Sequence, residues 1–123
     1  MSTKILINMA NTNRNKGHNY ERQLVKDFKE LGFTDCVTSR YGSKMLDDRG
    51  IDLMNTGPFV IQAKCYKRNP QYKKVLADMV IQPTDVPIIF HKAPGGKEYC
   101  ILHKEDMMEL LQMLISNKII NTP

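Results

Sequence analysis

The spacing of apolar residues along the chain changes from a helical period to the alternation of strands. Between His18 and Leu31, apolar residues recur every three or four positions, and Gly32 follows at a position that commonly ends a helix. Beyond Gly32 the apolar runs are short and bounded by turn-forming residues, which is typical of strands. We expect these strands at residues 36–40, 51–54 and 59–66.

The second half of the chain predicts a helix, a hairpin and a closing helix. An amphipathic segment at residues 71–82 indicates the first of these. Two apolar runs, at 86–91 and 98–103, flank the turn sequence PGGK at 94–97, which favours a hairpin. A last helix is expected at 104–115. The order αβββαββα predicts a single α+β domain in which helices flank a mixed sheet.

The length of the chain limits the number of domains, and its charge narrows the class of binding partner. A chain of 123 residues has room for one ordinary core, which we assign to residues 18–123. Residues 1–17 are polar and rich in Asn, Lys and Arg, which predicts a mobile basic arm, although a plain solvated tail has the same composition. The net charge of +5 favours a polyanionic partner. Because no apolar run approaches the roughly 20 residues that cross a bilayer, we expect a cytoplasmic protein without a membrane partner.

The cysteines and histidines do not indicate chemistry of their own. Cys36, Cys65 and Cys100 lie far apart and lack metal-ligand spacing, which argues against a disulfide framework or a zinc site. We expect reduced, buried thiols. His91 and the other two histidines are not spaced as ligands either, and we expect them at the surface or at strand edges.

The first candidate site residue is a carboxylate on the apolar stripe of the first helix. Glu21 lies four residues before Val25 and seven before Phe28, so it should face the core. A buried carboxylate needs a cation, a hydrogen-bond donor or a metal. The alternative is a Glu at the edge of the stripe, paired locally with Arg22 or His18.

The segments at 51–54 and 59–66 place three more polar residues together. Strand alternation puts Gln62 and Lys64 on the same face. If Asn55 pairs with Phe59 across a three-residue loop, Asp52 falls directly opposite Gln62. The alternative is a solvent-facing strand that carries an ordinary Asp/Lys pair.

This set of side chains suits hydrolysis of a phosphodiester bond. Magnesium prefers oxygen ligands and is usually held by one or two protein carboxylates, here Asp52 and Glu21. Gln62 and the backbone carbonyl of Ala63 would add neutral oxygens, and Lys64 would orient the attacking water and offset charge on the phosphate. We therefore expect a Mg²⁺-dependent hydrolase in which Mn²⁺ substitutes.

Three motifs resemble the PD-(D/E)XK nuclease superfamily. They are GHNYER at 17–22, GIDL at 50–53 and IQAKCYK at 61–67. The family pattern is a helix Glu, an Asp at the start of a strand and a (D/E/Q)xK tripeptide on the next strand. The resemblance implies a restriction-endonuclease-like fold with Glu21, Asp52, Gln62 and Lys64 as catalytic residues. Gln62 replaces the commoner acidic residue, which removes one negative charge from the metal site.

Two branches of the superfamily compete. The Glu21-Arg22 pair, the segment SRYGSK at 39–44 and the small size resemble Holliday junction resolvases of archaeal and phage type. GIDL and QAKCYK resemble equally the catalytic domain of Mrr-like restriction enzymes. Size favours the resolvase, because the Mrr type carries a further DNA-reading domain. The resemblance then implies an endonuclease of DNA recombination and repair that cuts four-way junctions near the branch point, in a bacterial or archaeal host cell or encoded by a phage.

Resolvases act as homodimers, because two symmetric nicks need two active sites, and the resemblance extends this to the present chain. The apolar residues of the helix at 104–115 exceed one core-facing stripe, which fits an interface or, as we favour, a well-buried helix. Residues expected to contact DNA phosphates are Arg14, Lys16, Arg22, Arg40, Ser43, Lys44, Lys67, Arg68, Lys73 and Lys74. Two alternatives stay open. One is a repair nuclease acting on ends, flaps or transfer RNA, and the other is a DNA-binding module whose site has decayed.

Overall fold

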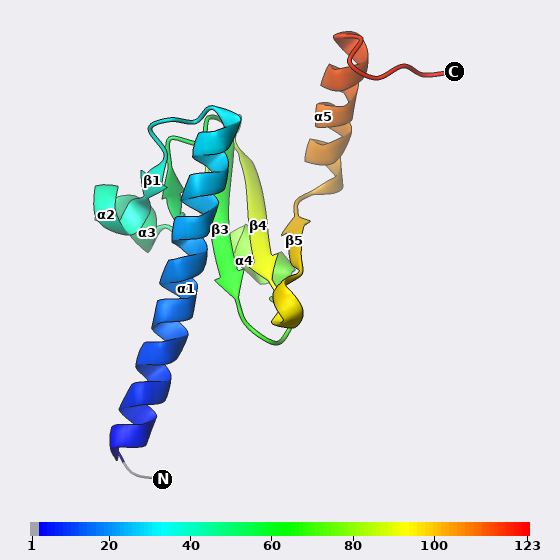
Figure 1. Ribbon diagram of the computed structural model, residues 1–123. Coiled ribbons are helices and arrows are strands. Elements are labelled where there is room, and N and C mark those ends of the chain that lie inside the picture. The colour runs from blue at the N-terminus through cyan, green and yellow to red at the C-terminus, as the bar shows by residue number, and fades with distance from the viewer. Residues whose placement is uncertain (1–2) are drawn as a thin grey trace.

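The computed structural model describes the backbone of residues 3–123 and the side chains from Arg14 onward. The chain forms a mixed α+β arrangement of helices around strands (Figure 1). In chain order the elements are α1 (Thr3–Leu31), β1 (Val37–Thr38), α2 (Ser39–Gly42), α3 (Lys44–Asp48), β2 (Leu53–Met54), β3 (Phe59–Cys65), α4 (Tyr72–Asp78), β4 (Val86–Lys92), the 3₁₀ turn η1 (Pro94–Gly96), β5 (Glu98–Ile101) and α5 (Lys104–Ser116).

The main sheet is mixed, as predicted. Its strands lie in the order β3-β4-β5, with β4 parallel to β3 and antiparallel to β5. Helix α4 makes the crossover that two parallel strands require. The antiparallel pair β4 and β5 confirms the predicted hairpin around the PGGK turn. Strands β1 and β2 form a separate two-stranded antiparallel ribbon.

Two helices cover the two faces of the main sheet, α1 on one side and α4 on the other (Figure 1). Under α1 the buried side chains are Tyr20, Leu24, Phe28, Cys36, Leu53 and Ile61. Under α4 they are Ile51, Val60, Leu76, Met79 and Ile89. Successive strand residues thus alternate between two apolar layers, which sets the face on which each polar side chain emerges.

The prediction of a mobile arm at residues 1–17 is wrong for residues 3–17, because their backbone is helical. Helix α1 already begins at Thr3, so the expected boundary at Gly17 falls inside it, while Met1 and Ser2 lie outside the described residues. The polar stretch contains no proline, and one interior glycine costs a helix only about 1 kcal/mol. The N-terminal half of α1 extends past the sheet (Figure 1).

The segment between the first two expected strands is mostly helical. The strand expected at 36–40 is limited to Val37–Thr38, and α2 and α3 follow it. Ser43 begins α3 as its N-cap, since its hydroxyl accepts a hydrogen bond from the backbone N–H of Leu46 at 3.3 Å. Two short helices are therefore added to the predicted order.

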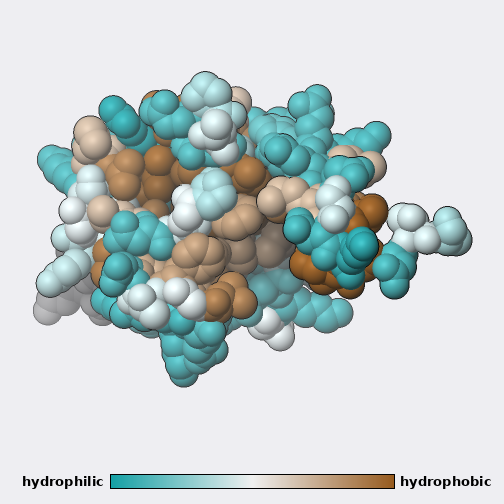
Figure 2. Space-filling view, turned by 90° about the horizontal axis from the view of Figure 1, so that it is seen from above, coloured by the Kyte–Doolittle hydropathy of each residue, from teal (hydrophilic) through white to brown (hydrophobic). Residues whose placement is uncertain are grey.

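Helix α5 corrects the expectation of a well-buried closing helix. None of its residues is buried, and it stands away from the sheet in Figure 1. With α1 and α4 already on the two faces, α5 is left beside one end of the sheet, where Leu110 and Met113 lie across a hollow from Phe59 and Val86. Figure 2 shows hydrophobic surface around this helix, and Met108 is 54% exposed.

Two smaller expectations also change. His91 is buried in β4, although we expected it at the surface or at a strand edge. Cys100 is exposed and Cys65 is half-buried, so the prediction of buried thiols holds for Cys36 alone. All three thiols are free in the structure.

Candidate active site

Glu21 points inward from α1, as the helical spacing predicted. Its side chain is about nine-tenths buried, and its Oε2 atom accepts a hydrogen bond from Nε of Arg40 at 2.8 Å. The alternative of a local pair between Glu21 and Arg22 is wrong, because Arg22 instead donates to the side chain of Asn19 at 2.9 Å. The partner of Glu21 is therefore supplied by α2, nineteen positions further along the chain.

Asp52 lies directly beside β3. Its backbone N–H donates to the carbonyl of Ile61 at 2.8 Å, and its carboxylate accepts from the N–H of Ala63 at 2.7 Å. These two bonds hold Asp52 next to Gln62, the residue between them. The ladder of β2 itself runs to β1, with Leu53 opposite Thr38, rather than to β3 as we expected. Asp52 makes the link between the ribbon and the main sheet.

Gln62 and Lys64 emerge together on the α4 side of β3. With the amide of Gln62 oriented to satisfy its neighbours, its nitrogen donates to the carbonyl of Gly50 and its oxygen accepts from Nζ of Lys64 at 3.2 Å. Gly50 has a positive φ of 77°, and a Cβ added there would lie 3.2 Å from the Gln62 amide. Glycine at position 50 thus allows both the turn and the close approach of Gln62.

The environment of Asp52 disfavours the ionised form of its carboxylate. Burial is the main reason why the pKa of Asp52 rises from its ordinary value of 3.8 to about 7. The N–H of Ala63 acts in the opposite direction, the charge of Glu21 raises the pKa further, and Lys64 lowers it. Two nearby carboxylates in a buried setting repel each other, and a bound cation would relieve that repulsion.

The oxygen donors fit a hard divalent ion in part. Among the side chains that the structure describes, no three His, Cys, Asp or Glu residues converge as a metal site. The donors at hand are the carboxylates of Asp52 and Glu21, with the amide oxygen of Gln62, which now faces Lys64. The backbone N–H of Ala63 donates to the carboxylate of Asp52. Two carboxylates are within the number that proteins commonly give to Mg²⁺.

Ser39 is a structural residue of the site that our sequence reasoning did not single out. Its backbone N–H donates to the carbonyl of Asp52 at 2.8 Å, and its hydroxyl donates to the carbonyl of Ile51. It is fully buried. A serine at the end of a predicted strand is a weak signal, because only the tertiary fold brings it to residues 51 and 52.

Ser39→Ala should therefore lower the free energy of unfolding by about 1–2 kcal/mol, since a buried carbonyl loses its donor. Chemical denaturation monitored by circular dichroism measures the change. Ser116→Ala, at an exposed serine of α5, is the matched control and should leave the stability unchanged. Equal stability of Ser39→Ala and the wild type would show that this contact contributes nothing.

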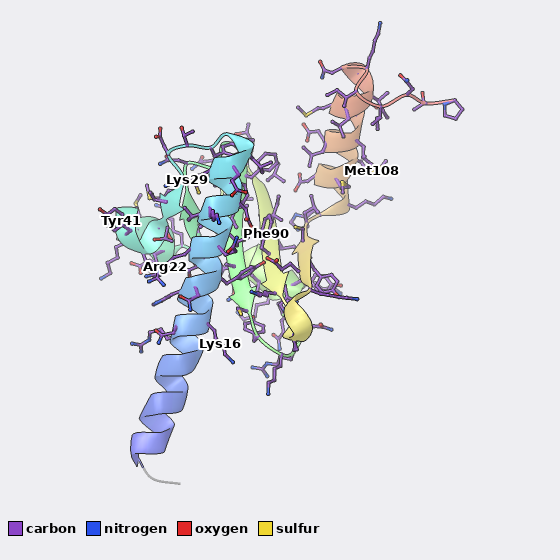
Figure 3. The ribbon with its side chains drawn as sticks, in the orientation of Figure 1. Lys16, Arg22, Lys29, Tyr41, Phe90 and Met108 are labelled. Atoms are coloured by element: carbon purple, nitrogen blue, oxygen red, sulfur yellow. The ribbon has the colours of Figure 1, made fainter. Side chains whose placement is uncertain are left out.

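The residues expected to contact DNA do not form one surface. Lys64 and Arg68 line a groove that also includes Tyr66, Asn69, Pro70 and Lys74, which we call the Lys64 groove. Arg22 and Arg40 line a different pocket beside Tyr41, and Lys16 lines a third. Figure 3 shows Lys16 and Arg22 on α1 and Tyr41 on α2.

Several of these side chains have partners within the chain. Arg40 is paired with Glu21, Ser43 caps α3, and Lys74 pairs with Asp78 at 2.7 Å on the surface of α4. These three side chains therefore make contacts within the protein in addition to any contact with DNA. Among the described residues, the expected ones that are exposed and form no ion pair are Arg14, Lys16, Arg22, Lys44, Lys67, Arg68 and Lys73.

Comparison of the chain with protein-family models, curated proteins and solved structures finds no match. Among the described residues, no helix combines the length and the apolar character needed to pass through a lipid bilayer.

Proposed function

We propose that the protein is a magnesium-dependent DNA endonuclease with a restriction-endonuclease-like fold, of the PD-(D/E)XK type. The observation that carries this proposal is the position of Asp52, held against β3 by Ala63, with Glu21 within electrostatic reach and Lys64 beside it. A helix Glu, an Asp beside a strand and a Lys two residues after Gln62 on that strand are the parts of the family pattern.

Each residue has a separate task in this proposal. Magnesium, when bound, would activate a water molecule and neutralise charge on the phosphate. Asp52 and Glu21 would hold the ion with carboxylate oxygens, and Asp52 must lose its proton to do so. Gln62 would turn its amide oxygen from Lys64 towards the ion. Lys64 would then be free to orient the attacking water and to offset the charge that builds on the phosphate.

Within this class we favour a Holliday junction resolvase that nicks four-way DNA junctions near the branch point. Support comes from the exposed basic side chains, which suit phosphate contacts without a base code. The proposal is tested by cleavage of an end-labelled four-way junction in Mg²⁺ and in Mn²⁺, beside flap, nicked and linear DNA.

The outcomes separate the rival functions. Paired symmetric nicks at the branch point support the resolvase. Cuts at flaps or in linear DNA alone would instead favour a repair nuclease or an Mrr-like restriction enzyme. Absence of cleavage on all substrates, in either metal, would overturn the enzyme and leave a DNA-binding module with a decayed site.

A resolvase needs two active sites, and α5 offers a surface for self-association. Met108, Leu111 and Ile115 follow one face of α5 at helical spacing. We expect the wild type to sediment at twice the chain mass and the double variant Met108→Glu, Leu111→Glu to sediment at the chain mass.

The control for this measurement is Met45→Glu on α3. Met45 is 57% exposed, close to the 54% of Met108, so the control adds a charge at an equally open methionine away from α5. It should leave the sedimentation unchanged. A monomeric wild type, or a dimer that survives both substitutions in α5, would contradict this interface.

A further inference from the structure

A row of side chains continues from Lys64 across the main sheet. Lys64 of β3 lies opposite His91 of β4, and His91 lies opposite Tyr99 of β5. Residues directly opposite each other in neighbouring strands point to the same face. This row therefore lies on the α4 side of the sheet. The buried side chains of α4 cover Val60 and Ile89 instead, so the row remains partly open.

His91 is fixed between two exposed tyrosines. Its ring centroid lies 5.9 Å from that of Tyr66 and 6.3 Å from that of Tyr99, with tilts of 48° and 33°. Its Nε2 atom lies 3.0 Å from the carbonyl oxygen of Tyr66, and because a carbonyl can only accept, Nε2 is the donor. Nζ of Lys64 lies 6.0 Å from the centre of the Tyr66 ring. The aromatic row thus begins at the proposed catalytic lysine.

The open end of the row forms a pocket, which we call the aromatic pocket. His91, Tyr99 and Tyr72 line it, together with Ile101. Tyr72 and Tyr99 are both about half exposed, so their rings are accessible. The same face of the molecule therefore offers several ring surfaces at one place.

The aromatic pocket adjoins the Lys64 groove. Asn69 and Pro70 line both of them. The groove brings the positive charges of Lys64 and Arg68, which attract phosphate, while the pocket brings tyrosine rings. A basic groove that follows the backbone beside aromatic rings that stack on bases is the usual arrangement of proteins that bind single-stranded nucleic acid.

We propose that the aromatic pocket binds an unpaired nucleobase of the DNA strand whose phosphates lie in the Lys64 groove. This inference rests on the proposed DNA substrate and narrows it. Bases within a duplex are stacked on their neighbours, so a ring that stacks face-on needs a base that is unpaired or turned out of the helix. The preferred substrate then carries, next to the scissile phosphate, a nucleotide that is unpaired or that turns out of the helix at the branch point.

The test compares two labelled duplexes that differ in one nucleotide. One contains a single unpaired adenine, and the other has an abasic tetrahydrofuran residue at that position. Fluorescence anisotropy in EDTA measures both dissociation constants without cleavage. Because stacking on one aromatic side chain contributes about 1–3 kcal/mol per base, we expect the wild type to bind the unpaired adenine about fivefold more tightly or better.

Variants assign the preference to the pocket. Tyr99→Ala and Tyr72→Ala should each bring the ratio of dissociation constants close to one, whereas Tyr99→Phe should keep it, because the ring remains. Tyr41→Ala is the control. This tyrosine is 88% exposed on α2, on the other side of α1 from β5, and its loss should leave the ratio unchanged (Figure 3).

The results distinguish this proposal from the nuclease. The pocket proposal is overturned if the wild type binds the two duplexes with equal affinity. It is also overturned if the ratio of dissociation constants is unchanged in Tyr99→Ala and Tyr72→Ala. Cleavage of both duplexes in Mg²⁺ without a preference would then leave the nuclease standing. A preference in EDTA, without cleavage of any DNA substrate (four-way junctions included) in Mg²⁺ or Mn²⁺, supports the pocket and overturns the nuclease. Absence of DNA binding overturns both.

Discussion

Asp52→Asn is expected to lower the rate of magnesium-dependent DNA cleavage by about a thousandfold or more. Asparagine retains an oxygen that can accept from the N–H of Ala63, so the local fold should persist. What it removes is the negative charge that would hold the metal ion, and metal-based charge stabilisation contributes several kcal/mol to such reactions. Lys64→Met should have a comparable effect, because it removes the ammonium group that would orient the attacking water and offset the charge on the phosphate.

Single-turnover cleavage of a labelled junction measures both rates, and anisotropy in EDTA shows whether binding persists. Asp48→Asn, at an exposed carboxylate of α3, and Lys29→Met, at an exposed lysine of α1, are the matched controls. Both should cleave at the wild-type rate. If Asp52→Asn or Lys64→Met retained more than about a tenth of the wild-type rate, these residues would not be the catalytic ones.

Without a divalent cation, Asp52→Asn should be more stable than the wild type at pH 8. Because the pKa of Asp52 is raised from 3.8 to about 7, the folded state holds a proton that the unfolded state has already lost. The stabilisation that comes from this bound proton is complete below about pH 4 and disappears as the pH rises through 7. The asparagine variant does not titrate, so its relative advantage at pH 8 should be on the order of 4 kcal/mol.

Denaturant unfolding in EDTA at pH 5 and pH 8 measures this difference. The wild type should lose stability between the two values relative to Asp52→Asn. Saturating Mg²⁺ at pH 8 should restore stability to the wild type alone, because the ion binds the ionised carboxylate. Parallel behaviour of the two proteins at both pH values would contradict the raised pKa, and an equal response to Mg²⁺ would contradict the role of Asp52 as a ligand.

The parts of the site that could be predicted from sequence follow from local periodicity. The inward direction of Glu21 follows from one helix period, and the shared face of Gln62 and Lys64 follows from strand alternation. The place of Asp52 beside Gln62 also agrees with the structure, but through a backbone bond to Ile61 and a side-chain bond to Ala63 rather than through a ladder with β2.

The parts that sequence did not predict depend on tertiary choices. The hydroxyl of Ser39 bonds to Ile51, and Ser43 caps α3, so the chain between the first two strands becomes helical where alternation predicted a longer strand. Helix α5 has the apolar residues of a buried helix, yet the faces it would cover are taken by α1 and α4. Periodicity shows that a face is apolar, but not what covers it.

The ion pair between Glu21 and Arg40 has a consequence for the order of binding events. The pair joins α1 to α2, and a cation that takes Oε2 of Glu21 must displace the guanidinium of Arg40. Arg40 would then be free to meet a phosphate. In the proposed nuclease, uptake of the metal and uptake of DNA would thereby be linked through one side chain, and by thermodynamic reciprocity each would strengthen the other to the same degree.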